Sequence, residues 1–312
     1  METVLSRHRR SLGPVGLLAL LILPVATGHA QRGVLPGGDL DSTLARASAR
    51  VEQYFARAQS LVCTETVHVQ PLSAGLTGDG FGRTIESELR LSWDGGGEGE
   101  TAGEARTRRQ VMKVNGHRPR AKDRDNCTGP EQHDTETQPL SMLLASERDD
   151  YAFSWAGLGK VDKRDALMID FRQVEKVKVE VRLLEGTEDC VSYDLTGGMR
   201  GRLWIDAETH DVLRLDQRLA GQVEVRLPEV LARRPGVSPI WTLERWDSSM
   251  RFKRVTFDEP QELLVLPVST TTLRVTQGSG TPRQRTTTTY SRYKRFLTGG
   301  RLVPGAPPPP EL

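Results

Sequence analysis

The chain has 312 residues, with 43 Lys and Arg against 41 Asp and Glu, and its formal net charge is +2. This balance excludes a general nucleic-acid partner, because nucleic-acid binding needs a concentrated basic face. The length is compatible with one large β domain or two small ones, and we take one large domain as the default.

The first 30 residues have the pattern of a secretory signal peptide. Three arginines within the first ten residues precede an apolar stretch over residues 12–25, and Gly28-His29-Ala30 provides small residues for cleavage. We therefore expect a mature protein that begins near Gln31 and is extracytoplasmic, either periplasmic or secreted. A membrane anchor is the alternative, but the apolar stretch contains two prolines and is shorter than the roughly 20 residues of a spanning helix. We expect no stable transmembrane span after cleavage, and the mature chain has 40 basic and 40 acidic residues.

Three cysteines remain in the mature chain, in a compartment where disulfides persist. Cys127 lies in a polar segment, whereas Cys63 follows an apolar run at the end of a predicted helix. We expect a disulfide between Cys127 and Cys190 and a buried thiol at Cys63, although the sequence leaves the other pairings open. Cys63 lies too far from the signal peptide to anchor a lipid.

One amphipathic helix opens the mature chain, after a flexible lead over residues 31–40. Apolar side chains recur at three- and four-residue spacing from Leu44 to Leu61, with arginines and Glu52 on the other side. Asp41 or Ser42 is placed to cap this helix, which we expect to run to about Leu61.

The hydrophobic period then changes to two, which predicts strands for most of the remaining chain. In the first half the predicted strands are 62–69, 83–93 and 108–114, with a glycine-rich loop over 75–82 and a turn at Asn115-Gly116. A polar insertion over 117–138 follows, which we interpret as a lid or a disordered insertion, and 139–147 is expected to form a short helix. In the second half the predicted strands are 151–155, 166–171, 174–184, 190–195, 201–206, 212–219, 240–246, 250–257, 263–277 and 285–295.

The predicted strand over 174–184 alternates with particular regularity. Its apolar side chains, Val177, Val179, Val181 and Leu183, face one way, and charged side chains occupy the intervening positions. This pattern is typical of a half-buried strand.

The predicted strands present more apolar face than one helix can cover. About nine strands spaced ~4.8 Å and ~25 Å long have a face near 1,000 Å², whereas a helix of ~20 residues covers about a third of that. Since soluble monomers rarely expose such a patch, the sheet must curl around the helix, close on itself, pair with another sheet or hold an apolar ligand. We predict an α+β, mostly β fold in which a curved antiparallel sheet, or half-barrel, packs on the N-terminal amphipathic helix.

The segment Gly201-Arg202-Leu203-Trp204-Ile205-Asp206, followed by Thr209 and Val212-Leu213-Arg214, resembles a hairpin of periplasmic lipoprotein-carrier and sorting proteins of the LolA/LolB type and their uncharacterised secreted relatives. The signal peptide, the N-terminal helix and the long strand meander are similar as well. The resemblance implies a half-barrel closed by helices, with an apolar cavity that accepts lipid acyl chains. This chain departs from the family in its length, its polar insertion and its Thr/Arg-rich segment over 286–295.

Within that hairpin we expect Trp204 to pack and Asp206 to form the turn by bonding the backbone two residues on. Neither is assigned to a ligand. The expected organisation is a signal peptide over 1–30, a lead over 31–40, one LolA/LolB-like domain over 41–298 with the insertion 117–138, and a proline-rich tail over 299–312.

Residue types that bind metals or phosphates show no matching pattern. His68, His117, His133 and His210 occur singly, without HxH, HExxH or CxxC spacing. The glycine-rich segment 78–82 lacks the Lys and the following helix of a phosphate-binding loop. We therefore assign no metal-binding or cofactor-binding residue and expect no cofactor.

Paired carboxylates at Asp149-Asp150 and at Glu98 and Glu100 are the nearest approach to a catalytic set. Acidic pairs in loops are usually solvated, so we assign no catalytic residue. Asn126-Cys127-Thr128 is an N-glycosylation sequon, which matters only in a source that glycosylates such sites.

We predict an extracytoplasmic, non-catalytic binding or carrier protein for an apolar ligand, a lipid or a lipoprotein acyl chain, whose binding residues the sequence does not identify. The alternative is an envelope structural or interaction module that binds another envelope protein through its sheet edge, charged face or proline tail. A hydrolase is the third possibility, and it needs titratable groups that converge in a cleft.

Overall fold

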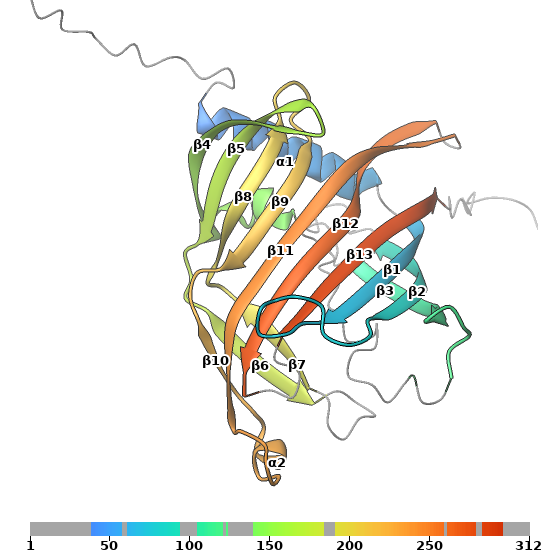
Figure 1. The fold of residues 1–312 in the computed structure, drawn as a ribbon. Coiled ribbons are helices and arrows are strands. Elements are labelled where there is room, and N and C mark those ends of the chain that lie inside the picture. The colour runs from blue at the N-terminus through green and yellow to red at the C-terminus, as the bar shows by residue number, and fades with distance from the viewer. Residues whose placement is uncertain are drawn as a thin grey trace, which may run out of the picture. The chain divides into compact units, whose positions relative to one another are not determined.

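An 18-residue helix and a large antiparallel sheet dominate the structure (Figure 1), a computed structural model that describes residues 39–57, 61–93, 105–120, 123, 140–183, 191–258, 261–278 and 283–295. The chain divides into the units Met1–Val34 and Leu35–Leu312, and every described residue belongs to the second. Several predicted features lie outside the described residues: the signal peptide, most of the insertion 117–138 with its sequon, Glu98, Glu100, Cys127, His133, Cys190 and the proline-rich tail.

Eleven strands form the main sheet, in which ten follow the order β3-β2-β1-β13-β12-β11-β9-β8-β5-β4 and β10 pairs with β11. Their bounds are β1 Leu61–Pro71, β2 Arg83–Trp93, β3 Ala105–Val114, β4 Tyr151–Val161, β5 Arg164–Gln173, β8 Met199–Asp206, β9 Val212–Leu219, β10 Val223–Arg226, β11 Ile240–Phe257, β12 Glu262–Gln277 and β13 Arg283–Arg295. A separate two-stranded sheet contains β6 (Lys178–Leu183) and β7 (Val191–Thr196). Every pairing is antiparallel, including that of β1 with β13, which joins the two ends of the β-rich chain.

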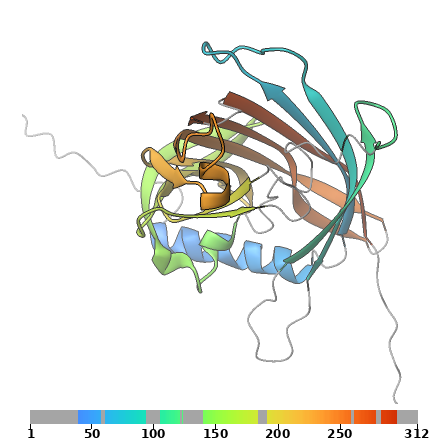
Figure 2. The same cartoon turned by 90° about the horizontal axis from the view of Figure 1, so that it is seen from below.

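The sheet curves and stays open, because β3 and β4 are its two edges in the part of the chain that the structure describes. Seen from below, it wraps around α1 (Leu40–Arg57), as Figure 2 shows. The predicted half-barrel packed on an N-terminal amphipathic helix is therefore confirmed. The strands run between two ends of the sheet. We call the end that carries the β4–β5, β8–β9 and β11–β12 turns the helix end, and the other the distal end.

The main hydrophobic core lies between α1 and the concave face of the sheet. From α1 it includes Leu44, Ala47, Val51 and Phe55, which recur at the three- and four-residue spacing of one helical face. These side chains pack against buried residues of β5, β8, β9, β11 and β12, and against the 3₁₀ turn Ser141–Leu143. The helix thus covers only the helix end of the concave face.

The helix boundaries differ from those predicted. The N–H of Ser42 donates to Asp39 Oδ1 at 2.7 Å, so Asp39 is the cap, ahead of the predicted Asp41 or Ser42. The helix ends at Arg57, and Leu61 already belongs to β1. No helix of the described residues is both long and apolar enough to cross a membrane.

Four other elements correct the sequence prediction. The segment 139–147 forms the short 3₁₀ turn Ser141–Leu143 instead of an α-helix. The two strands predicted over 240–246 and 250–257 are one continuous strand, β11, because Asp247 and Ser248 pair with both β9 and β12. Strand β10 and the single-turn helix α2 (Glu229–Ala232) were not predicted.

Candidate functional site

The centre of the apolar core at the helix end is buried among the residues that the structure describes. Its central side chains are at most 1% exposed, and they come from four strands and the 3₁₀ turn: Leu143, Leu167, Ile169, Leu203, Ile205, Leu215 and Leu266. The helix and the turn therefore cover the centre of this half of the concave face.

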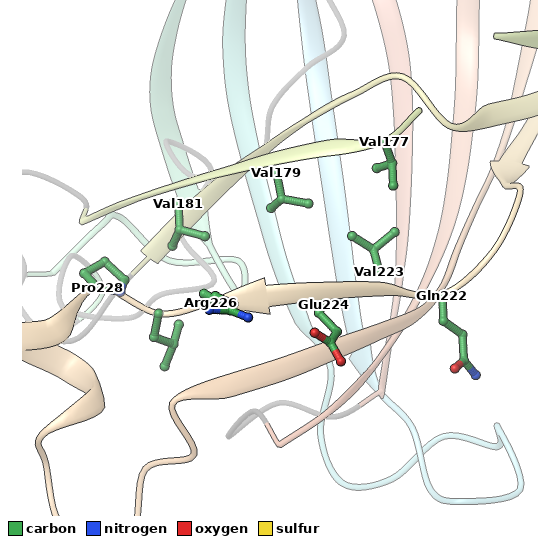
Figure 3. A pocket seen from close by; sticks show the side chains of 9 residues that line it. Val177, Val179, Val181, Gln222, Val223, Glu224, Arg226 and Pro228 are labelled. Carbon is green, nitrogen blue, oxygen red and sulfur yellow. The ribbon is translucent and has the colours of Figure 1, made fainter. Parts of the chain in front are cut away.

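An open groove with a volume of about 600 Å³ lies near the distal end, between β6 and β10. Val177, Val179 and Val181 form one wall, and Val223, Leu227 and Pro228 form the apolar part of the other. Figure 3 shows the three valines of the β6 segment pointing toward β10, with Val223 pointing back at them. The groove is thus an aliphatic slot between two strands that do not pair with each other.

The alternation of side chains along a β-strand explains which of these residues share a face. Val177, Val179 and Val181 share one face of the β6 segment as predicted, whereas Leu183, predicted on the same face, is exposed and does not belong to the groove lining. In β10, Val223 and Val225 are buried while Glu224 and Arg226 are exposed. The β6 segment therefore turns an apolar face to the groove, whereas β10 contributes Val223 to it and buries Val225 in the cluster beside it.

A second hydrophobic cluster includes side chains from both walls of the groove. Leu219, Val223, Val225 and Leu243 are its buried members, and Trp241 and Trp246 pack against it together with the valines of β6. The indole Nε1 of Trp241 is buried and has no hydrogen-bond partner within the described chain. The two-stranded β6–β7 sheet thus packs on the main sheet through a small cluster of its own.

Polar side chains border the groove on the β10 side. Gln222, Glu224 and Arg226 belong to its lining, and all three are exposed. In Figure 3 the side chains of Gln222 and Glu224 point away from the valine wall. The groove therefore has an aliphatic interior and a polar rim of mixed charge, which suits a chain-like apolar ligand with a polar end.

Asp206 and Trp204 have the structural roles that the sequence predicts. Asp206 Oδ1 accepts hydrogen bonds from the N–H groups of Glu208 (3.1 Å) and Thr209 (2.8 Å), which form the β8–β9 turn. Its Oδ2 lies 2.8 Å from Arg164 Nε. Trp204 packs against Val161, Ala166 and Leu213, and the Arg214 guanidinium lies 4.7 Å from the centre of its ring.

Asp211, in the same hairpin, attaches α1 to the sheet. Its carboxylate accepts hydrogen bonds from Arg50 of α1 (2.8 Å), Arg254 of β11 (3.1 Å) and the Thr209 hydroxyl (2.9 Å). Burial raises the pKa of Asp211, but these hydrogen bonds outweigh burial and hold the pKa below its usual value. Asp211 is thus a buried ionised group that links three elements.

A buried ion pair lies in the part of the sheet formed by β1, β2 and β3. Glu65 of β1 is 1% exposed and bonds twice to the guanidinium of Arg109 on β3, with Nη2 3.1 Å from Oε1. The expected buried thiol of Cys63 lies on the same strand and is free. Burial, assisted by the negative charge of Glu65, raises the pKa of Cys63 to about 12, so the thiol is protonated and unreactive near neutral pH.

The other residues considered in the sequence lie apart from one another. His68 of β1 is within hydrogen-bonding distance of Thr84 (3.0 Å), and His117 and His210 lie in turns at opposite ends of the sheet. Asp149 and Asp150 are exposed. No group of three or more metal-ligating side chains occurs in the described ranges.

Sequence reasoning missed half of the groove, because it did not identify β10. The signal was present in Val-Glu-Val-Arg over residues 223–226, which alternates with period two and is followed by Pro228. A strand of four residues is too short for this period to stand out against the adjoining loop. That Val223 faces Val177 depends on packing between segments some 46 residues apart.

Comparison with known proteins gives structural likenesses alone, since a scan against family models and a search of the curated proteins find no match. A DUF1329 family protein from Desulfovibrio piger is 12% identical with a TM-score of 0.42, covering 85% of this chain and 95% of that one. A domain described as an outer membrane lipoprotein-sorting protein, from Vibrio parahaemolyticus, is 12% identical with a TM-score of 0.39, covering 84% and 94%. A LolA superfamily protein from Nitrosomonas europaea is 10% identical with a TM-score of 0.31, covering 82% and 93%.

These likenesses agree with the LolA-type resemblance drawn from the β8–β9 hairpin. At such low identity and TM-score they carry no argument about ligand, partner or residue role. The functional argument therefore rests on the geometry of this chain.

Proposed function

We propose that the protein is an extracytoplasmic, non-catalytic binding or carrier protein for a lipid or a lipoprotein acyl chain, which lies in the groove between β6 and β10. The observation that carries this proposal is an open, valine-lined groove of about 600 Å³ beside a core that is closed. That volume falls within the roughly 300–1,000 Å³ of typical small-molecule sites.

The chemistry of the walls favours an aliphatic chain. The apolar lining residues are Val, Leu and Pro, without an aromatic ring that would stack on a planar ligand. Val177, Val179 and Val181 are half-buried, so a ligand that fills the groove removes further apolar surface from water. Each methylene buried in this way contributes about 0.8 kcal/mol to binding.

The extracytoplasmic location rests on the pattern of residues 1–30. N-terminal sequencing of the protein purified from an envelope or secreted fraction tests it. A start near Gln31 supports export with cleavage, whereas a protein that retains Met1 in the cytoplasm contradicts it.

The lipid proposal is tested by mass spectrometry of organic extracts from protein purified without detergent. We expect a stoichiometric lipid in the wild-type protein and its loss in Val179→Asp, because a carboxylate in the valine wall opposes an acyl chain. Lys178→Asp is the matched control, since Lys178 is the adjacent residue and its side chain points to water. Near-UV circular dichroism verifies that each variant is folded.

Equal lipid content in Val179→Asp and Lys178→Asp would exclude the groove as the binding site. If Val179→Asp does not fold, Val177→Gln provides a milder change in the same wall. A folded wild-type protein that carries no lipid and binds no hydrophobic dye would overturn the proposal and favour the envelope interaction module.

A further inference from the structure

Three arginines lie side by side on neighbouring strands of the main sheet. Arg172 of β5 is the direct cross-strand partner of Arg200 on β8, and Arg200 is the direct partner of Arg218 on β9. Residues opposite each other in an antiparallel pair project from the same face, with their Cβ atoms ~5 Å apart. The three strands are neighbours in Figure 1, so the arginines form a row about 10 Å long. We call it the arginine row.

The arginine row lies on the outer face of the sheet, opposite the core. Phe171, which precedes Arg172, is buried in the main core, and Leu219, which follows Arg218, is buried in the second cluster. Because side chains alternate along a strand, the arginines point away from both clusters. All three are exposed to solvent.

The row differs from its neighbours in being unpaired. No hydrogen bond or ion pair engages any of the three guanidinium groups in the described part of the chain. The next charged residues along the same strands are paired instead, because Arg202 bonds to Asp170 (2.6 Å) and Arg214 to Asp216 (2.6 Å). A set of charges that cancel thus lies next to three positive charges that do not.

Carboxylates at the two ends of the row leave most of its charge in place. Asp247 of β11 is the cross-strand partner of Arg218, but it is bound to Arg245 of its own strand, so this pair adds no net charge. At the other end Asp150, just ahead of β4, lies beside Val174 and offsets part of the charge near Arg172. Arg200, in the middle, has an arginine on either side.

Such an arrangement is unfavourable for the sheet by itself. Like charges directly opposite each other on neighbouring strands are destabilising, and salt screens exposed charges only in part at ~5 Å. An anion that bridges the arginines removes this repulsion. The register of three strands thus holds three guanidinium groups where one compact anion can meet all of them.

We propose that the arginine row binds an anion with two adjacent phosphate groups, either free or as the headgroup of a lipid. A phosphate group has close to two negative charges and three strong acceptor oxygens, and it accepts paired bonds from arginine. Two linked phosphates therefore suit three guanidinium groups within about 10 Å. An acidic peptide suits them less, because carboxylates on one face of an extended chain are roughly 6.6 Å apart and have one charge each.

The test is isothermal titration calorimetry of the exported protein, its N-terminus verified, with pyrophosphate. We expect binding that weakens as salt is raised, and binding of orthophosphate at least tenfold weaker. Arg200→Gln should weaken pyrophosphate binding about tenfold, because it removes the central charge-assisted bonds. Arg233→Gln is the matched control, since it removes the same charge from an exposed arginine that follows α2 and should leave binding unchanged.

Absence of pyrophosphate binding would overturn the proposal, as would equal losses in Arg200→Gln and Arg233→Gln. Orthophosphate that binds as tightly as pyrophosphate would also contradict it. If Arg200→Gln does not fold, Arg218→Gln tests the same row.

Thermal denaturation gives a second readout, which a purely structural role of Arg200 would not produce. Without ligand, Arg200→Gln should melt no lower than the wild-type protein, because the substitution removes repulsion. Pyrophosphate should raise the melting temperature of the wild-type protein more than that of the variant. A variant that melts well below wild type without ligand would show that Arg200 stabilises the sheet itself and would contradict the proposal.

Titration with a prenyl diphosphate distinguishes the two sources of the anion. Tighter binding than that of pyrophosphate would identify a lipid headgroup, and equal affinity would identify the free anion; both outcomes support the arginine row. The site is separate from the groove, so Val179→Asp should lose bound lipid and still bind pyrophosphate. Loss of pyrophosphate binding in Val179→Asp would contradict a site on β5, β8 and β9.

Discussion

Glu65 is the least exposed charged side chain among the described residues, and it is buried within a β-strand. Taking a carboxylate out of water costs several kcal/mol, which only a close cation with good hydrogen-bond geometry offsets. Arg109, two strands away, supplies both through its paired bonds to Glu65. The pair thereby fixes the register of β1, β2 and β3, because a one-residue slip would turn one partner to the other face.

Glu65→Gln should lower the free energy of unfolding by about 3 kcal/mol, because it leaves a buried guanidinium without its counter-charge. Urea denaturation measures the change. Glu86→Gln on β2 is the control, because Glu86 contacts Lys113 (3.2 Å) on the exposed face, where loss of an ion pair costs roughly 0–1 kcal/mol. Equal losses in the two variants would show that burial of the Glu65 pair contributes nothing.

The pH dependence of Asp211 follows from the sign of its pKa shift. Its pKa is lower in the folded protein than in the unfolded chain, so its contribution is complete above about pH 4 and is lost as the pH falls further. Asp211→Asn should therefore cost about 2 kcal/mol at pH 7, and the difference from wild type should shrink near pH 3.

Urea denaturation at the two pH values measures this difference. Asp162→Asn is the control, since Asp162 is half-exposed and its contact with Arg251 is 3.4 Å long. A difference between wild type and Asp211→Asn that stays constant from pH 7 to pH 3 would contradict the assigned role.

At the scale of elements, the β8–β9 hairpin is the part in which sequence and structure agree most closely. The predicted turn at Asp206 and the packing of Trp204 are both present. Gly201, in the same segment, lies where β8 passes β9 and β5 closely. A Cβ at this position would lie 2.0 Å from the Asp216 carbonyl oxygen and 2.7 Å from Phe171 Cζ.

Gly201→Ala should destabilise the protein by about 2 kcal/mol, because a backbone atom cannot move aside as a flexible side chain does. Thermal and urea denaturation measure the loss. Gly221→Ala, just after β9, meets nothing within 4 Å and should be close to neutral. A Gly201 variant as stable as the Gly221 variant would show that the two strands separate freely.

The prediction of elements was wrong where a local sequence signal competed with pairing or packing between segments far apart in the chain. Polar Asp247 and Ser248 look like a turn in sequence, yet β9 and β12 pair on both sides of them and keep β11 continuous. At α1, Asp39 caps the helix, although Asp41 and Ser42 are residues of the same capping type. Local propensity does not choose among such neighbours, and packing of the apolar face onto the sheet does.

At the scale of the whole molecule, the closed core and the open groove lie at opposite ends of one sheet. The core is shared by α1 and many strands, whereas the β6–β7 sheet is supported by a small cluster. Regions with few buried apolar contacts open locally at lower free energy. The groove is therefore expected in the more dynamic part of the protein, where a wall can move to admit a ligand.

Hydrogen exchange measured by mass spectrometry tests this division. Amides of β5, β8 and β9 should exchange most slowly, and those of β6, β7 and β10 fastest. Lipid should slow exchange in β6 and β10 specifically, because it binds the folded groove alone. Uniform protection across the sheet, or slowing confined to α1, would argue against a ligand between β6 and β10.

The sequence by itself determined the strand-rich class, the amphipathic helix, the Asp206 turn and the apolar face of Val177, Val179 and Val181, because period and turn chemistry are local. Tertiary structure alone decided which distant segments meet. It placed β10 opposite those valines, Arg109 beside Glu65 and Arg50 on Asp211. It also placed α1 at the helix end, where the helix covers the core. The groove and Phe81, toward the distal end, stay exposed. Such pairings depend on sheet order and curvature, which residues far apart in sequence determine jointly and no single segment encodes.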